Sequence, residues 1–449
     1  MALISAFSVF VISMISCLVL GQSILIALVI GLFAFVAVGC TKGFSPGKVF
    51  LMAGRGVRDS LVVLEIMFMI GFITAIWRAS GTITYFVYYG VKFVTPPLFV
   101  LLAFLMSCLL SYILGTSFSV SGTLGVILMA LARSGGVDPL ITAGAVMSGI
   151  YFGDRCSPAS SSAILVANVT KTDLMDNVKY MHKTGLIAVL LSTGLYAFLS
   201  FRNPLQQVDA AIMDSMLKEF SLSVLTLLPA VFILVLPMLK LDIRWAFLGS
   251  ILSGFVLMVT LQDMDLLDAL KCCIVGFVPQ DADLVNIIGG GGAVSMLEVC
   301  GIIMLSCSYS GVFKGTDMLA DVQDRINRMM NRTGRFLLMV ILGFMTSVVF
   351  CSQTIAIMLC SDLMTKPYLQ TGGNRTELAI DIENATVLIS VMIPWNIACT
   401  VPLEMMGVGM KTLAYSYLIF LLPLLYIFTK RIWFKDSVDK IEKLSCPLR

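Results

Sequence analysis

The sequence predicts an all-α polytopic membrane protein with about 10–13 membrane segments, organised as two inverted-topology repeats that contain broken helices. Hydrophobic residues make up 58% of the 449 residues and charged residues only 13%, whereas soluble domains have about 25% charged residues. Apolar runs long enough to cross a membrane recur along the chain. Several of these runs are interrupted by polar residues together with proline or glycine, which is where helices break and expose backbone groups that lipid cannot satisfy.

Composition also argues against other classes of protein. A net charge of +3 gives no reason to expect a nucleic-acid partner. The 12 cysteines are scattered without metal-ligand spacing, so we expect buried thiols in a reduced protein. The one histidine, His182, excludes a zinc protease with several histidine ligands. We therefore expect no enzyme and no cofactor. The expected setting is the lipid bilayer of the cell (inner or plasma) membrane, without a cleaved signal because the first apolar segment lacks a basic region.

The first repeat, with the N-terminal helices, is expected to cover residues 1–201. Its predicted spans are Leu3–Leu20, Ser23–Cys40, Ser60–Ser80, Leu98–Leu114 and Gly185–Phe201. The tyrosine-rich stretch Gly81–Thr95 is expected to be interfacial or re-entrant. Two apolar pieces, Gly125–Ala132 and Pro139–Phe152, are too short to span alone.

A polar linker, residues 202–219, separates the halves, and the second repeat is expected to cover residues 220–429. Its predicted spans are Phe220–Leu239, Trp245–Leu261, Asn286–Ser310, Phe336–Cys351 and Ala414–Phe428. The chain then ends in a charged cytoplasmic tail, residues 430–449.

The loops predict that the two halves are inverted. The loop 41–59, before the helix that Leu64-Glu65 opens, has four basic residues and one aspartate, whereas its counterpart 262–283 has one lysine and five aspartates. The loops after these helices reverse the bias, with two basic residues in 78–95 and five in 314–335. Because basic residues favour the cytoplasmic side, equivalent loops lie on opposite sides of the membrane.

The stretch 148–168 predicts one half of a transport site. Asp154 and Arg155 stand within an apolar run, where each charge costs about 2.5–3.5 kcal/mol, so such residues persist mainly where they face a cavity or each other. Pro158 and a cluster of serines follow at once. A second interrupted stretch, 383–410, opens with Glu383. Paired broken segments in inverted halves are typical of the substrate site of a secondary transporter.

Asp154 and Glu383 are the predicted carriers of Na⁺, because hard cations take oxygen ligands. Hydroxyl and amide groups on the broken segments are the other predicted ligands: Thr116, Ser117, Ser119, Ser157, Ser160, Ser161, Ser352, Gln353, Asn384, Thr386 and Asn396. Structural alternatives stay open, namely an ion pair between Asp154 and Arg155 and close helix packing by the small residues of 115–123. Arg155 could also serve as a counter-charge, an anion clamp or an interfacial anchor.

Two further features have structural interpretations. Glu65 and Glu298 lie near the starts of apolar helices, where a carboxylate suits the helix dipole. The glycine-rich stretch 286–292 lacks the ending of a phosphate-binding loop, so close packing is the expected role.

The sequence resembles the NhaC family of Na⁺/H⁺ antiporters over about residues 60–409. The resemblance rests on Gly115-Thr116-Ser117, on Tyr151–Asp154 with Ser157-Pro158, and on Ile393–Asn396. It implies an inverted-repeat transporter with re-entrant hairpins and broken helices. It also implies cation-coupled exchange, either Na⁺ for H⁺ or a dicarboxylate with protons for a monocarboxylate with Na⁺.

The chain departs from the family pattern at the site itself. Ser161 stands where members commonly have an acidic residue, Ala163 replaces a threonine, Glu383 replaces the usual aspartate and Val391 replaces a proline. Exchange of Na⁺ for H⁺ is the leading function. Transport of a small carboxylate such as malate or lactate, coupled to Na⁺ or H⁺, is the alternative, and a homodimer is left open. A passive channel, a membrane scaffold or an intramembrane hydrolase would leave the mirrored motifs unexplained.

Overall fold

The computed structural model describes residues 2–20, 22–59, 61–93, 96–206, 210–239, 241, 243–316 and 333–434. Across these ranges the chain is helical, and the only β contact is an isolated bridge between Phe277 and Gly290. The all-α prediction is therefore confirmed.

The N-terminal helices include the three predicted spans, and one more of them, residues 46–59, occupies most of the predicted loop 41–59. They are α1 (Ala2–Leu20), α2 (Ile24–Thr41), α3 (Pro46–Asp59), α4 (Leu61–Ala79) and α5 (Thr82–Phe93). Between α4 and α5 the chain bends by 58° at Gly81, whose φ of +79° is a conformation that glycine adopts without strain. The stretch predicted to be interfacial or re-entrant is thus the short helix α5.

The next elements form a hairpin rather than a span. They are η1 (Pro96–Leu98), α6 (Phe99–Leu114), α7 (Ser117–Val120), the π-helix η2 (Ser121–Gly125) and α8 (Val126–Ser134). The 16 residues of α6 measure about 24 Å at 1.5 Å per residue, less than the hydrocarbon thickness of about 30 Å. The chain turns back at Gly115, so the prediction of a full span over Leu98–Leu114 is wrong.

A broken helix and a long helix complete the first half. Asp138 caps α9 (Pro139–Cys156), residues 157–160 interrupt the helix, and Ser160 caps α10 (Ser161–Thr170). The long helix α11 (Leu174–Arg202) begins well before the predicted span at Gly185, because its first turns are polar.

The stretch that contains the linker and the beginning of the second half is largely helical. It contains α12 (Ala210–Glu219), η3 (Val224–Leu227), α13 (Leu228–Met238), α14 (Ile243–Thr260), α15 (Leu266–Val275), α16 (Ala282–Ile288), η4 (Ala293–Met296) and α17 (Leu297–Gly315). The polar linker therefore includes a helix, α12. The predicted run 286–310 begins too early, because Gly290, Gly291 and Gly292 all have positive φ and separate α16 from the apolar segment Ala293–Gly315, which is long enough to cross a membrane. The packing role expected of this stretch is confirmed, since Gly292 N–H donates to the carbonyl of Gly71 on α4 at 2.9 Å.

The second half repeats the hairpin and the broken helix. Its elements are α19 (Arg335–Phe350), α20 (Gln353–Gln370), α21 (Arg375–Ile382), the π-helix η6 (Glu383–Val387), α22 (Leu388–Met392), α23 (Ile397–Met406), η7 (Met410–Tyr415) and α24 (Tyr417–Trp433). The predicted tail overlaps α24, and its first residue, Lys430, is buried. Residues 435–449 of that tail lie outside the described ranges.

A constant spacing relates the two halves. The helices that start at Leu61, Phe99, Pro139 and Ser161 have counterparts that start at Leu297, Arg335, Arg375 and Ile397, in each case 236 residues later. The partners also match in length: 19 residues in α4 and α17, 16 in α6 and α19, and 10 in α10 and α23.

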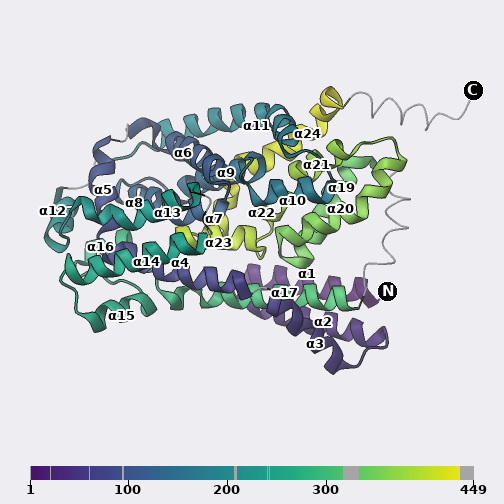
Figure 1. Cartoon of the computed structure of the whole chain (residues 1–449), viewed down its shortest axis with the longest axis horizontal. Helices are drawn as coiled ribbons and strands as arrows, with labels where there is room; N and C mark the ends of the chain where they lie inside the picture. The colour runs from purple at the N-terminus through teal and green to yellow at the C-terminus, as the bar shows by residue number, and fades with distance from the viewer. Residues whose placement is uncertain are drawn as a thin grey trace, which may run out of the picture.

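The two copies run in opposite directions along the long axis of the molecule. In Figure 1, α6 begins near α5 at one end, whereas α19 begins at the other end, where α17 finishes. Each hairpin therefore enters from its own end and turns near the middle. The re-entrant hairpins and inverted repeats of the predicted fold are both present.

Contacts of Glu65 and Glu298 support the structural role expected for them. Glu65 lies 3.7 Å from Arg244 in the first turn of α14, and Glu298 accepts a hydrogen bond of 2.8 Å from Ser23, the N-cap of α2. Each carboxylate thus fastens a long helix of one half to a helix of the other half.

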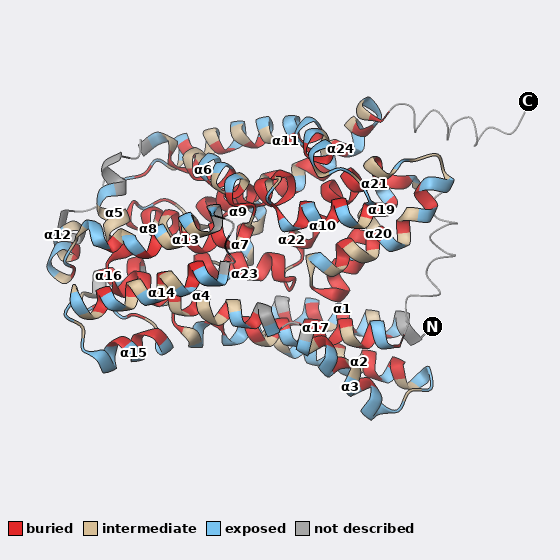
Figure 2. Cartoon of the chain, in the orientation of Figure 1, coloured by how far each residue is buried: buried red, intermediate tan, exposed pale blue. Residues whose placement is uncertain are grey.

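Burial separates a lipid-facing exterior from a polar centre. Figure 2 shows buried residues concentrated around α9, α22 and α23, with exposed residues on outer helices such as α11. By length and composition alone, four helical segments in the described part of the chain could cross a membrane, one of them the returning arm of the first hairpin (Ser117–Ser134), and counting three bent pairs raises this to seven. Four shorter apolar helices, including both outward hairpin arms, accompany them, so the chain is a multi-pass membrane protein.

Candidate functional site

The tips of the two hairpins meet the breaks of the two long helices. Gly115 packs so tightly on the first break that a Cβ there would lie 2.4 Å from the carbonyl carbon of Ala159. At the equivalent place in the second half, the carbonyl of Cys351 accepts a hydrogen bond of 2.9 Å from Ile397 N–H. Both Gly115 and Cys351 have positive φ, +68° and +53°, which reverses the chain at each tip. Each hairpin tip therefore contacts the break of its own half.

Asp154 lies in the last turn of α9, where the helix breaks. Its carbonyl accepts hydrogen bonds from the hydroxyls of Ser160 and Ser162, the latter at 2.6 Å. These serines satisfy a backbone group that the break exposes, as burial requires. Its carboxylate is left for other partners, and Oδ2 lies 3.4 Å from Nε2 of Gln353.

Gln353 joins both halves at this point. It is the first residue of α20, directly after the second hairpin tip, and its Nε2 also donates to the carbonyl of Val387 at 3.2 Å. Val387 closes the π-helix η6, and such π-bulges occur frequently at functional sites. A carboxylate, an amide and a backbone carbonyl thus gather within hydrogen-bonding reach of one side chain.

Arg155 is fully buried and bound to three neighbours. Its Nε donates to Oδ1 of Asn384 at 2.9 Å, and its Nη2 donates to the carbonyl of Met181 at 2.8 Å and to Thr184 Oγ1 at 3.2 Å. Its Nη1 has no hydrogen-bond partner and lies against Gly185. Arg155 is therefore fixed against α11 and η6, and it is not ion-paired with Asp154.

Glu383 is the most unusual side chain of the site. It is completely buried in η6, and neither carboxylate oxygen has a hydrogen-bond partner. Arg155 and Asp154 are the charged groups close enough to interact with it electrostatically. An ionised carboxylate buried in this way is very costly, so the charge of Glu383 has to be balanced by a proton or by positive charge nearby, to which Arg155 contributes.

The other predicted ligands have varied surroundings. Ser157 donates to the carbonyl of Tyr112 at 2.6 Å, and Ser160 is occupied with Asp154 and the start of α10. At the first hairpin tip, Thr116 donates to Ser119 at 2.5 Å, and Ser117 is buried beside them. Ser161 is exposed and is not among the side chains that contact Asp154.

In the second half the predicted ligands have different partners. Asn396 caps α23 by accepting from Ala398 N–H, and it donates to the carbonyl of Ser347 at 3.1 Å. Thr386 contacts Met339 of α19, Ser352 caps α20 without a side-chain hydrogen bond, and Asn384 holds Arg155. The residues that come together around Asp154 and Glu383 are therefore Gln353, Arg155 and Asn384.

Sequence analysis missed several polar residues near the site. Thr184 accepts a hydrogen bond from Arg155 directly. A separate buried cluster consists of Arg335, Tyr368, Glu377, Asp381, Tyr426 and Lys430. The signal for this cluster was the spacing of Glu377 and Asp381, and of Tyr426 and Lys430, which places each pair on one helix face.

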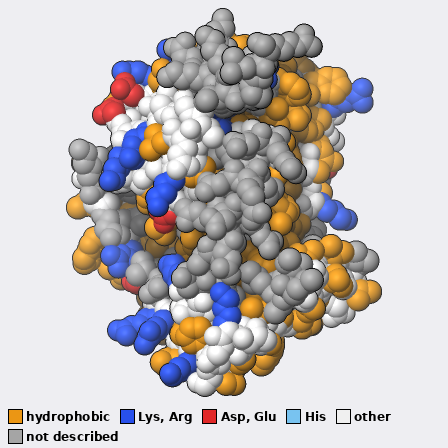
Figure 3. All heavy atoms as spheres, turned by 90° about the vertical axis from the view of Figure 1, so that its right-hand side faces the viewer, with side chains coloured by type: hydrophobic (Ala, Val, Ile, Leu, Met, Phe, Trp, Pro, Cys, Tyr) orange, Lys and Arg blue, Asp and Glu red, His pale blue; other side chains and the backbone are white. Residues whose placement is uncertain are grey.

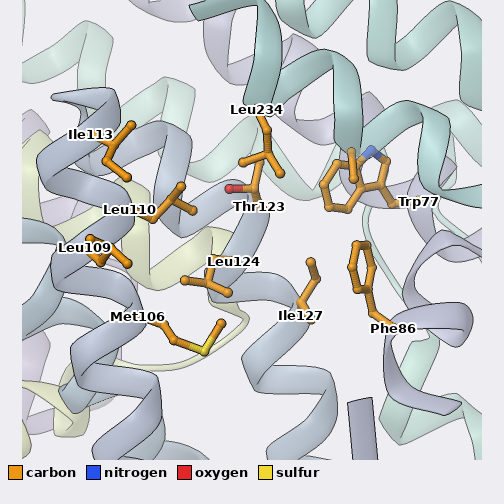
Figure 4. A pocket seen from close by; sticks show the side chains of 11 residues that line it. Trp77, Phe86, Met106, Leu109, Leu110, Ile113, Thr123, Leu124, Ile127 and Leu234 are labelled. Carbon is orange, nitrogen blue, oxygen red and sulfur yellow. The ribbon is translucent and has the colours of Figure 1, made fainter. Parts of the chain in front are cut away.

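The site is not a conventional metal centre, and one apolar cavity of the described part of the molecule lies apart from it. In the described ranges, no three His, Cys, Asp or Glu side chains gather as metal ligands. A cavity of about 270 Å³ lies between α4, α5, α6, η2 and α13. Figure 4 shows that Thr123 supplies the only oxygen among the labelled lining side chains, and that hydroxyl donates to the carbonyl of Ser119.

Comparison with known proteins places this arrangement in a family. Residues 1–181 and 149–432 match the model of the Na⁺/H⁺ antiporter family. The chain belongs to the Na⁺/H⁺ antiporter family. It is thus a secondary transporter of the class that its breaks and hairpins indicate.

Relatives in this family differ in what their names say they carry. A malate-2H⁺/Na⁺-lactate antiporter of Bacillus subtilis is 26% identical over 99% of this chain and 96% of its own length. The Na⁺/H⁺ antiporter NhaC of Alkalihalophilus pseudofirmus is 24% identical over 83% of this chain and 82% of its own. An arginine/ornithine antiporter of Halobacterium salinarum is 28% identical over 86% and 84%. The names of these relatives therefore agree on an antiporter and differ in the transported solute.

Proposed function

We propose that this chain exchanges Na⁺ for H⁺ at the site between the two breaks, with Asp154 and Glu383 as the groups that alternate between cation and proton. The observation that carries the proposal is Glu383, a buried carboxylate without a hydrogen-bond partner beside a second buried carboxylate. A proton or a cation can each neutralise this pair, and their competition for it couples the two fluxes.

Oxygen atoms for Na⁺ are available around Asp154. The carbonyl of Val387 and the side chain of Gln353 lie together with the Asp154 carboxylate, and the amide can present its oxygen by turning over. Hard cations favour carboxylate, amide and carbonyl oxygens. Arg155 supplies a fixed positive charge next to Glu383. This charge limits how much further positive charge, from Na⁺ or protons, Asp154 and Glu383 can bind together.

The charge at one end of the molecule supports an orientation in the membrane. Figure 3 shows the end that bears the start of α19, where lysine and arginine side chains are spread widely with few acidic ones among them. Basic residues favour the cytoplasmic side, so this end is assigned to the cytoplasm. The membrane is assigned as the plasma or inner membrane, and a homodimer stays a proposal without a contact that carries it.

Transport of a small carboxylate is the second candidate, favoured by the malate/lactate relative whose alignment covers nearly the whole chain. Most of the donors expected to hold a carboxylate are occupied, however, and only Nη1 of Arg155 among them is left without a hydrogen-bond partner. Arg155 is bound by Asn384, Met181 and Thr184, and Ser160 and Asn396 cap the starts of α10 and α23. Simple cation exchange therefore fits this site better.

The test is transport by purified protein in liposomes that contain a pH-sensitive dye. A Na⁺ jump outside is expected to change the internal pH, whereas an equal choline jump is not. Asp154→Asn and Glu383→Gln are expected to abolish the response, and Glu65→Gln, at an exposed carboxylate on α4, is expected to preserve it. A response that requires added malate or lactate would replace Na⁺/H⁺ exchange by carboxylate transport.

A further inference from the structure

The apolar cavity of about 270 Å³ lies beside the first hairpin. Its walls come from both arms of that hairpin, α6 and η2 with α8, from the bent pair of α4 and α5, and from α13 of the second half. Figure 4 shows Leu109, Leu110 and Ile113 on one side of the cavity and Trp77 and Phe86 on the other. The cavity therefore lies between the first hairpin and the helices next to it.

The polar groups of the lining are already bonded within the protein. Among the described lining side chains, only Trp77 and Thr123 carry a nitrogen or an oxygen atom. Trp77 Nε1 donates to Ser250 Oγ on α14 at 2.9 Å, and Thr123 Oγ1 donates to the carbonyl of Ser119 at 2.7 Å. A water molecule needs about two to four polar partners to stay in a cavity, and one hydroxyl oxygen is too few. The lining therefore favours an apolar ligand over water, an ion or a carboxylate.

The cavity opens on the lipid-facing side of α6. Met106, Leu109 and Ile113 line it, and these residues are 46%, 64% and 45% exposed. Their spacing of three and four positions places them on one face of the helix. Trp77 and Ala230 line the cavity as well, and both are buried. The cavity thus has an exposed apolar rim on α6 and a buried inner wall.

The depth of the opening decides which part of a lipid meets it. The rim lies on the part of α6 that leads to the hairpin tip at Gly115, and Figure 1 shows this hairpin turning near the middle of the molecule. The middle of a bilayer is its hydrocarbon core, which is about 30 Å thick. The rim therefore faces acyl chains rather than headgroups.

Filling the cavity with hydrocarbon is favourable. Lining atoms without a neighbour lose their dispersion contacts outright, and a protein interior packs more densely than a liquid. An engineered apolar cavity of about 150 Å³ binds benzene. The cavity beside α6 is larger, so it has room for a stretch of an acyl chain.

We propose that this cavity binds one acyl chain of a bilayer lipid, which enters past Met106, Leu109 and Ile113 and ends against the rings of Trp77 and Phe86. The ligand is the hydrocarbon chain, and the headgroup stays outside the site. Bound in this way, the chain packs between the first hairpin and α4. The site is independent of the exchanged ions, so its test does not depend on the Na⁺/H⁺ exchange proposed above.

Trp77 makes the occupant measurable, because bromine on an acyl chain quenches the fluorescence of an indole that it approaches closely. The chain has four tryptophans, and variants that keep one of them and replace the other three by phenylalanine are reconstituted in phosphatidylcholine vesicles with or without brominated acyl chains. The protein that keeps Trp77 is expected to lose as much fluorescence as the one that keeps Trp245, although Trp77 is buried and Trp245 is exposed. The protein that keeps Trp395, a buried indole bonded to the carbonyl of Val348, is expected to retain its fluorescence.

A cavity-filling substitution tests the site itself. Ala230→Phe places a ring in the cavity from α13 and is expected to protect Trp77 from bromine. Val231→Phe is the matched control, because Val231 is the next residue and is exposed, so quenching of Trp77 should stay unchanged. Thermal unfolding in detergent checks that each variant is folded. If the triple substitutions do not fold, the difference in quenching between the wild type and Trp77→Phe gives the contribution of Trp77.

Two results would overturn the proposal. If brominated chains quench Trp245 but not Trp77, no acyl chain occupies the cavity, as when a protein segment covers its opening. If Trp77 is quenched equally in Ala230→Phe and Val231→Phe, bromine reaches the indole by another path and the cavity is not the site.

Discussion

Gln353 Nε2 lies 3.4 Å from the carboxylate of Asp154, although the two residues belong to different halves of the chain. The same nitrogen reaches the carbonyl of Val387 in η6. One amide at a hairpin tip therefore connects the broken helix of the first half to the π-helix of the second. This connection makes Gln353 the residue whose loss should affect ion binding with the least effect on the fold.

Gln353→Ala is expected to raise the Na⁺ concentration for half-maximal exchange about tenfold, because a lost hydrogen bond to a charged group costs roughly 1.5–3 kcal/mol. Thr354→Ala is the control, since Thr354 is the next residue and is exposed. The measurement is the rate of internal pH change against Na⁺ concentration. If the exchange rate depends on Na⁺ concentration in the same way in the two variants, Gln353 does not take part in Na⁺ binding.

Gly185→Ala is expected to disturb Arg155. A Cβ at Gly185 would lie 2.9 Å from Nη1 of Arg155, and the guanidinium is held on its other side by Asn384. The guanidinium has to shift, so exchange should fall several-fold while the protein still folds. Gly194→Ala, on the same helix with open space around it, should leave the rate unchanged and add about 1 kcal/mol of helix propensity. Equal rates for both variants would count against an electrostatic role for Arg155.

Gly115→Ala is expected to destabilise the first hairpin tip. The backbone at Gly115 has a φ of +68°, and the new Cβ would overlap the backbone of Ala159; strain and overlap together should cost roughly 2–4 kcal/mol. Thermal unfolding in detergent, followed by fluorescence, measures the loss. Gly122→Ala is the matched variant, because its Cβ would make only an ordinary contact with Met405. Similar unfolding temperatures for the two would show that the tip tolerates a side chain.

Local composition predicted the breaks but not the paths that helices take between them. Glycine, proline and serine within apolar runs mark the interruptions near Gly115, Ser157 and Pro394. These breaks could be predicted because the residues that cause them stand at the breaks themselves. An apolar helix such as α6 has the same local pattern whether the chain crosses the membrane or turns back. Only the contact of Gly115 with Ala159, 44 positions along the chain, distinguishes the hairpin from a span.

The hydrogen-bond and ion-pair partners of individual side chains could not be predicted from the local sequence pattern either. Lys430 was expected to begin an exposed tail, yet it pairs with Glu377 and Asp381, which are distant in sequence. The serines near Asp154 were expected to be ion ligands, but Ser160 and Ser162 donate to its backbone carbonyl. Residue type predicted that the site contains oxygen atoms, and the folded arrangement decides which of these oxygens are free.

Binding of Na⁺ at Asp154 is expected to stabilise the protein, because a ligand that binds only the folded state stabilises it by RT ln(1 + [L]/Kd). At a Na⁺ concentration of 100 Kd this amounts to about 2.7 kcal/mol. Thermal unfolding should therefore shift upward in NaCl relative to choline chloride at the same ionic strength. Asp154→Asn is expected to lose this shift, since the carboxylate that attracts the cation is gone. Glu298→Gln should keep it, because Glu298 contacts Ser23 at an exposed position. A Na⁺ shift that persists in Asp154→Asn would place the cation elsewhere, and a shift lost in both variants would point to a general effect of surface charge.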